Sequence, residues 1–182
     1  IGTLPWGLEV PLRPFFGVMG VAPPREWGSI STIEPRAHGG NLDNKELIPG
    51  ATLYLPVFNE GAGFSVGDGH AVQADGEVCV TALETALAGT FEIHVRKDLR
   101  LDYPAAETPS HLITMGMDPD LDTAARDALR RMVDRVVRET GLSRNRAFML
   151  MSLVADVHVT QLVNNHKGIH VMMPKARLQS PS

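Results

Sequence analysis

Glycine and proline are concentrated in the first 80 residues of this 182-residue chain. Proline fixes φ and lacks a backbone donor, and glycine permits sharp turns, so this composition disfavours long helices. It predicts many short strands joined by turns instead. Apolar runs at 11–24, 51–58 and 63–66 fit such strands. We expect the alternating segments 77–87 and 89–99 to form a pair of longer strands.

The pattern changes at about residue 110. Segment 111–117 predicts a strand, and an apolar stripe at helical spacing follows it up to Val136. Asp118 or Asp120 can cap the start of this helix, and Gly141 can end it. Ser143 is positioned to cap a second helix, and the segments 157–164 and 168–175 read as two closing strands.

These signals together predict a mostly β protein with an α+β appendage. We expect an antiparallel β-sandwich or barrel-like core over residues 1–108 and a small two-helix α+β subdomain over 109–182. The chain starts at Ile1 as if in mid-sequence, so we also expect that a further N-terminal part is missing.

Bulk composition excludes some classes of function. The chain is 43% hydrophobic and 21% charged, with a formal net charge of −4, so nothing favours a nucleic-acid or anionic-membrane partner. No apolar run approaches the roughly 20 residues of a membrane helix. With Cys79 as its single cysteine, the chain cannot form an intrachain disulfide. We therefore expect a reducing, cytoplasmic location.

The segment GFSVGDGHAVQADGEV, residues 63–78, places Asp68, His70, Asp75 and Glu77 close together among glycines. Side chains two residues apart on a strand share a face, so Asp68 pairs with His70, and Asp75 with Glu77. An imidazole beside carboxylates suits Zn²⁺ or a similar divalent ion. The alternative is structural, because Asp-Gly pairs are also the usual residues of hairpin turns.

A second polar cluster is RAHGGNLDNKEL, residues 36–47. Asp43 is a candidate ligand or base, Asn41 a candidate for orienting an amide, and Gly39 and Gly40 candidate N–H donors to an oxyanion. The alternative is that Asn41 or Asp43 only caps a helical turn.

For two further residues, Cys79 and Glu84, the sequence leaves two alternative roles open. Cys79 is either a core cysteine in an apolar strand or the nucleophile of a thiol amidase, and the sequence shows no adjacent base and no helix start beside it. Glu84 lies either on a solvated face or at the back of a pocket. We expect no ligand-like partner near His158, His166 or His170, which are predicted in or near the closing strands.

The motifs PLRPFFGVMGVAPP, HGGNLDNKEL, LYLPVF, SVGDGHAVQADGEVCVTALET, VRKDL and ITMGMDPDLDTAARDA follow one another along the chain. In this order they resemble the acetamidase/formamidase family, in its C-terminal portion and with a likeness to the γ-lactamase branch. One letter departs from the family pattern, because Ala74 stands where glycine is usual. If position 74 needs a positive φ, we expect the loop to be reshaped.

The resemblance implies an amidohydrolase that cleaves the C–N bond of short non-peptide amides. It further implies a divalent metal, commonly zinc, and assembly as a homo-oligomer, with or without a separate N-terminal fragment of the same precursor. Our leading hypothesis is metal-activated water, with Asp68, His70 and one or more of Asp43, Asp75 and Glu77 as ligands and Glu77 or Glu84 as proton acceptor. The alternatives are a metal-free thiol amidase using Cys79 and a non-enzymatic module that binds an ion or small molecule.

Overall fold

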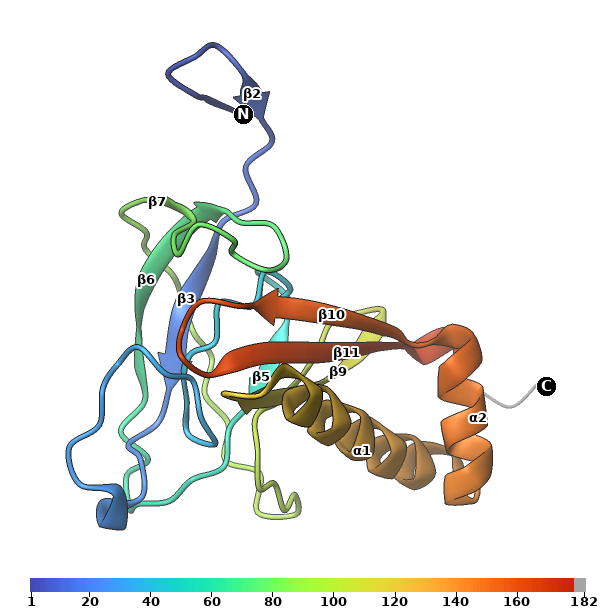
Figure 1. Ribbon diagram of the computed structural model, residues 1–182. Helices are drawn as coiled ribbons and strands as arrows, with labels where there is room; N and C mark the ends of the chain where they lie inside the picture. Colours follow the sequence, from blue (N-terminus) through green and yellow to red (C-terminus); the bar gives the residue numbers. More distant parts are fainter. Residues whose placement is uncertain (179–182) are drawn as a thin grey trace.

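The computed structural model describes residues 1–178, and these residues form three antiparallel sheets and two α-helices (Figure 1). The strands are β1 Gly2–Thr3, β2 Glu9–Val10, β3 Phe15–Gly20, β4 Gly39–Asn41, β5 Thr52–Tyr54, β6 Ser65–Val72, β7 Leu83–Glu84, β8 Ala105–Glu107, β9 His111–Asp118, β10 Asp156–Gln161 and β11 Lys167–Pro174. The helices are α1 Leu121–Thr140 and α2 Arg144–Val154, with short 3-10 turns η1 Arg25–Trp27 and η2 Lys175–Arg177.

A four-stranded sheet in the order β4-β3-β6-β7 holds most of the polar motifs. Its central pair is β3 and β6, and β6 runs through the whole SVGDGHAV segment. The strand expected at 63–66 is therefore longer than predicted, and its Asp and His side chains lie within a hydrogen-bonded ladder. The small β1–β2 hairpin projects away from this sheet at the N-terminal end (Figure 1).

A five-stranded sheet in the order β10-β11-β9-β8-β5 is covered on one face by α1 (Figure 1). The core between them includes Met132, Val136, Val171 and Met173, all fully buried. Gly116 of β9 allows the helix to approach closely, because a Cβ there would lie 2.1 Å from the carbonyl oxygen of Ala124. Pairing with β9 and packing against α1 thus hold the β10–β11 hairpin in place.

Both helices begin where the sequence predicts, and α1 also ends there. The Asp120 side chain accepts a hydrogen bond from the Thr123 N–H at the start of α1, and Gly141 ends that helix with a φ of 71°. The Ser143 side chain accepts from the Arg146 N–H at the start of α2. These caps satisfy backbone groups that a helix end would otherwise leave free.

The prediction of two long strands at 77–87 and 89–99 is wrong. Only Leu83–Glu84 pairs in the first segment, and no strand forms in the second. Val78 is 81% exposed and Val95 81% exposed, so the alternating apolar residues have no sheet face to cover. Alternation is a local property, whereas a strand needs a partner for its backbone groups.

The predicted class, mostly β with a two-helix α+β part, is confirmed. The boundary at residue 108 stays a prediction, and the five-stranded sheet takes strands from both sides of it. Residues 179–182 of the predicted second domain lie outside the described residues. Within residues 1–178, neither helix combines the length and the apolar character needed to cross a membrane.

The close contact at Gly116 gives a stability prediction. Gly116→Ala should lower the free energy of unfolding by at least about 2 kcal/mol, because the new methyl group overlaps the α1 backbone. The matched control is Gly67→Ala on β6, where a Cβ would meet nothing within 4 Å. Urea denaturation of both variants checks this, and equal destabilisation of the two would contradict the packing argument.

Candidate functional site

The pairing of β3 with β6 builds one end of a polar cluster. Phe15 lies opposite His70, and Val18 lies opposite Gly67, so Gly17 faces the segment that carries Asp68. A Cβ on Gly17 would lie 2.5 Å from Asp68 Oδ2, 2.6 Å from Asp43 Oδ1 and 2.9 Å from His70 Cε1. Gly17 therefore leaves open the space onto which these three side chains converge.

Three carboxylates approach the His70 Nε2 atom. The distances are 3.2 Å to Asp68 Oδ2, 3.5 Å to Glu84 Oε1 and 3.9 Å to Asp43 Oδ1. Glu77 also offers a carboxylate oxygen within 4.8 Å of ligand atoms of His70 and Glu84. We call Asp43, Asp68, His70, Glu77 and Glu84 the carboxylate cluster. It joins the two motifs that the sequence analysis singled out.

Gln73 fixes the orientation of the His70 ring. The His70 Nδ1 atom lies 2.8 Å from Gln73 Oε1, and Gln73 Nε2 donates to the Asp43 carbonyl at 2.7 Å. The amide oxygen can only accept, so Nδ1 carries a hydrogen, and Nε2 is the ring nitrogen that faces the carboxylates. Such a second hydrogen bond is usual for a histidine that binds a metal. Sequence reasoning did not find Gln73, although it lies only three residues from His70.

Asp43 is almost completely buried, at 1% exposure, as is His70. Its Oδ2 atom accepts a hydrogen bond from the side-chain amide of Asn164, which follows β10. Its Oδ1 atom is buried and has no hydrogen-bond partner among the described residues. A buried carboxylate oxygen without a partner is costly, so this atom is suited to bind a cation. No local sequence signal connects Asn164 to Asp43.

Burial perturbs the acids of this cluster. It raises the pKa of Asp43 to about 8, with a further contribution from the negative charge of Glu77. Burial also raises the pKa of Asp68 and the pKa of Glu77. The cluster therefore concentrates more negative charge than its neighbours compensate.

Three cluster residues adopt backbone conformations that are rare outside glycine. The φ angles are 46° at Asp43, 62° at Asp68 and 44° at Glu77. Backbone strain of this kind clusters at functional sites, and aspartate tolerates it better than glutamate does. By contrast, Ala74 has no positive φ, so the expected strain at that position is absent.

The structure places Asp75 apart from the carboxylate cluster. Its Oδ2 atom lies 3.0 Å from His158 Nδ1, and its Oδ1 atom lies 3.0 Å from Lys45 Nζ. The expectation that Asp75 converges with Asp68 and His70 is therefore not met. The expectation that His158 and His170 have no ligand-like partner is wrong, because Asp75 gathers with both.

The predicted substrate-binding residues lie on β4, and some of their donors are engaged. The Gly39 N–H donates to the Arg36 carbonyl at 3.0 Å, so it is not free for an oxyanion. The Asn41 side chain donates to the Ile33 carbonyl at 3.3 Å. Gly39 and Gly40 both have φ near 87°, which fits a tight turn beside β3. A role for Asn41 and Gly40 in substrate binding stays a prediction.

One of the two alternatives for Cys79 placed it in the core, and this is wrong. Cys79 is exposed in a turn. Its thiol lies 3.6 Å from the Thr81 carbonyl oxygen. Cys79 and Glu77 both line a hollow of about 360 Å³, whose other walls include the apolar side chains of Leu4, Trp6 and Val10. Glu77 is the member of the carboxylate cluster that lines this hollow, whose size suits a small molecule.

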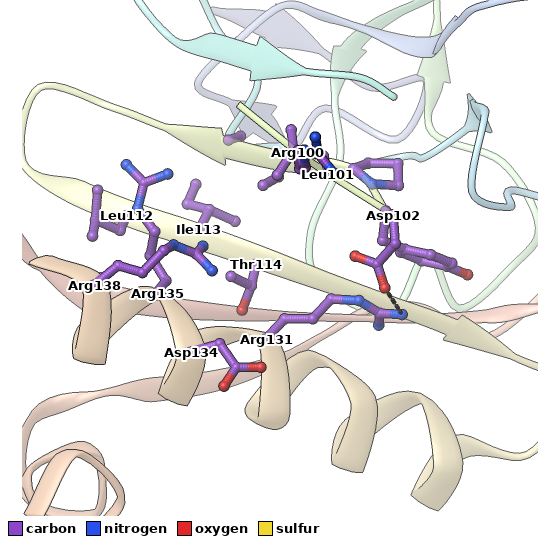
Figure 2. A pocket seen from close by; sticks show the side chains of 14 residues that line it. Arg100, Leu101, Asp102, Leu112, Ile113, Thr114, Arg131, Asp134, Arg135 and Arg138 are labelled. Atoms are coloured by element: carbon purple, nitrogen blue, oxygen red, sulfur yellow. Dashed lines mark ion pairs between the residues drawn. The ribbon is translucent and has the colours of Figure 1, made fainter. Parts of the chain in front are cut away.

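A smaller hollow of about 110 Å³ lies between α1 and the β8–β9 hairpin (Figure 2). One of its arginines, Arg131, makes several contacts within the fold. The Arg131 guanidinium stacks 3.9 Å from the centre of the Tyr103 ring and donates to the Met115 carbonyl at 3.2 Å. Figure 2 shows its ion pair with Asp102, at 4.0 Å. No carboxylate-imidazole cluster lines this hollow, so we place the candidate site at the carboxylate cluster.

The sequence pattern of the Acetamidase/Formamidase family matches residues 28–177 of this chain. That range includes every member of the carboxylate cluster. The chain therefore belongs to the Acetamidase/Formamidase family, and the resemblance drawn from the sequence motifs is confirmed at the level of the family.

Individual relatives agree. A formamidase from Methylophilus methylotrophus is 45% identical over 65 residues, which are 35% of this chain and 16% of the relative. The crystal structure of an acetamidase from Bacillus halodurans is 39% identical with a TM-score of 0.86, covering 92% of this chain and 56% of that one. The crystal structure of an acetamidase from Yersinia enterocolitica is 30% identical with a TM-score of 0.84, covering 94% of this chain and 51% of that one. The chain thus spans little more than half the length of these solved relatives. The likeness to a lactamase branch stays a prediction.

The raised pKa of Asp43 gives a pH prediction for metal-free protein. The folded pKa near 8 exceeds the ordinary value of 3.8, so the folded chain holds this proton more tightly than the unfolded chain. Stability therefore falls as pH rises from about 4 to about 8. Asp43→Asn removes this loss and should raise the free energy of unfolding at pH 8 by more than about 1.4 kcal/mol, the equivalent of one pKa unit.

Urea unfolding of the chelator-treated protein at pH 5 and pH 8 measures the effect. The gain from Asp43→Asn should be larger at pH 8, whereas the exposed control Asp122→Asn should show no such pH dependence. A gain that is equal at both pH values would mean that Asp43 is not a strained carboxylate.

Proposed function

We propose that this chain forms the metal-binding part of an amidase that hydrolyses the C–N bond of short, non-peptide amides. Membership of the Acetamidase/Formamidase family supports the reaction class. Formamidase and acetamidase are the names that the relatives carry, and either would fit a small amide substrate.

The observation that carries the proposal is that Asp43, Asp68 and His70 converge over Gly17, with Glu84 as a third carboxylate 3.5 Å from His70 Nε2. The donor set is one imidazole nitrogen with hard oxygen atoms, which suits zinc and similar divalent ions. The buried Asp43 Oδ1 atom without a partner and the raised pKa values of Asp43 and Asp68 are relieved by a cation. The residues therefore fit the metal that the family resemblance implies.

Asp43, Asp68 and His70 would hold the ion. When bound, a zinc ion of this kind polarises a carbonyl oxygen and lowers the pKa of a bound water. Other side chains of this chain orient these ligands. Gln73 orients His70, and Asn164 orients Asp43. The ligand role of Asp75 proposed from sequence finds no support in its position.

Glu77 is the favoured proton acceptor. Its Oε2 atom is buried without a hydrogen-bond partner among residues 1–178, and burial raises its pKa above the ordinary value, which favours proton uptake by this carboxylate. Glu84, in contrast, already accepts from Thr81 Oγ1 at 2.9 Å and from the Ala82 N–H at 3.1 Å. Glu77 would take a proton from the attacking water and deliver it to the leaving nitrogen as the C–N bond breaks.

The hollow beside Glu77 supports a small substrate. Its volume of about 360 Å³ exceeds what formamide or acetamide needs, and much of its wall is apolar. A small cyclic amide would fit as well. We keep the expectations of a cytoplasmic, homo-oligomeric enzyme as parts of the same proposal.

Metal removal tests the proposal. Treating the full natural protein with a chelator should abolish hydrolysis of formamide and acetamide, and added Zn²⁺ should restore it. Asp68→Asn should lower kcat/KM by at least about 100-fold, since it removes a ligand in a cluster whose outer partners alone are worth about 10- to 100-fold. Ammonia release is the readout, and full activity in metal-free protein would refute metal dependence.

Cys79→Ser separates water attack from the thiol alternative. Cys79 lines the hollow, but within residues 1–178 it makes no hydrogen bond to a residue of the carboxylate cluster. The activity of Cys79→Ser should therefore stay within about threefold of wild type. A loss of several orders of magnitude, as expected for removal of a nucleophile, would favour the thiol amidase instead.

A further inference from the structure

A second group of potential ligands lies outside the carboxylate cluster and shares no residue with it. One ligand atom from each of Asp75, His158 and His170 lies within 4.8 Å of the others. His158 and His170 are directly opposite in the β10–β11 ladder, so both side chains lie on one face of the sheet. Their rings are stacked with centres 4.8 Å apart. We call these three residues the hairpin triad.

His170 contributes a buried ring nitrogen to this group. The residue is fully buried, and its Nδ1 atom lies 2.7 Å from Thr160 Oγ1. Its Nε2 atom is buried and has no hydrogen-bond partner among the described residues. Burial lowers the pKa of His170 to about 4, so the ring is neutral at physiological pH. A neutral imidazole held through one nitrogen and free at the other is the form that binds a metal.

Asp75 supplies an anionic oxygen to the same place. Its Oδ2 atom lies 3.0 Å from His158 Nδ1, a separation at which both atoms can reach one ion. Its Oδ1 atom contacts Lys45 Nζ at 3.0 Å, and Lys45 is also held by Glu46 at 2.8 Å. Lys45 thus occupies one carboxylate oxygen and leaves the other available, as is common for carboxylates that bind metals.

We propose that Asp75 Oδ2, His158 and His170 Nε2 form a binding site for a divalent transition-metal cation of the Zn²⁺ class. Two imidazoles and one carboxylate make up a donor set that zinc prefers over calcium or magnesium. The side chains of His158 and Asp75 are 30% and 31% exposed, so an ion has access from solvent and can keep a water ligand. The site does not depend on amidase activity.

The position of the hairpin triad gives the ion a structural effect. Asp75 lies in the loop whose next residues are Gly76 and Glu77, and this loop is already joined to β10. The Gly76 N–H donates to the Thr160 carbonyl at 3.1 Å, and the Leu162 N–H donates to the Gly76 carbonyl at 3.0 Å. An ion bound to Asp75 and to the β10–β11 hairpin would add a third link and restrain the loop that carries Glu77.

Crystals soaked in Zn²⁺ test the location directly. We expect an anomalous peak at the zinc edge between Asp75, His158 and His170 in the wild-type protein. The same peak should persist in Asp68→Asn, which damages the carboxylate cluster alone. Failure of the proposed amidase site would remove the other peak and leave this one, so the two proposals can fail separately.

Zinc titration by calorimetry supplies the second measurement, with the Asp68→Asn protein as the background. His158→Gln should weaken Zn²⁺ binding at this site by at least about 100-fold, and Thr160→Val, which loses only the partner of His170 Nδ1, by about 10- to 100-fold. The matched control is His111→Gln, a partly exposed histidine of the same sheet that contacts Ser110 instead. It should leave binding unchanged.

Circular dichroism verifies that each variant is folded. The proposal is overturned if soaked crystals give no anomalous peak at the hairpin triad. It is also overturned if folded His158→Gln and Thr160→Val bind Zn²⁺ as tightly as the background protein.

Discussion

The burial of negative charge beside a single imidazole is the constraint on which the polar half of this structure depends. Asp43 is almost completely buried, and its pKa rises because neither solvent nor a cationic side chain compensates its charge. Such a group is tolerated in a folded protein only if a proton or a cation neutralises it. The glycine at position 17, the amide of Asn164 and the amide of Gln73 all serve this arrangement, since each leaves room for or orients one of the charged groups.

The four-stranded and the five-stranded sheet both contribute residues to the site. The β3–β6 pair carries Asp68 and His70. The β10–β11 hairpin of the five-stranded sheet packs against α1, and Asn164 of this hairpin donates a hydrogen bond to Asp43. A loop between β6 and β7 carries Glu77 and is joined to β10 by backbone hydrogen bonds. The site thus requires both sheets to be in place, which explains why its parts are distributed over the length of the chain.

Local features of this fold could be predicted and distant ones could not. The caps of α1 and α2 lie within a few residues of what they cap, and Asp68 and His70 share a strand face by spacing alone. Asn164 reaches Asp43 across 121 residues, and no pattern in either segment signals that contact. The false strand at 89–99 fails for the same reason, because alternation specifies a face but not the neighbour that would pair with it.

The left-handed backbone at Asp43, Asp68 and Glu77 has a consequence for engineering and evolution. Glycine would adopt the same φ angles without steric cost, so selection for heat resistance alone would favour losing these acids. Their presence therefore works against thermal robustness at three places at once. Variants selected only for a higher melting temperature should include changes at these positions, together with changes at Ala62, Val80 and Asn165, which also have a positive φ.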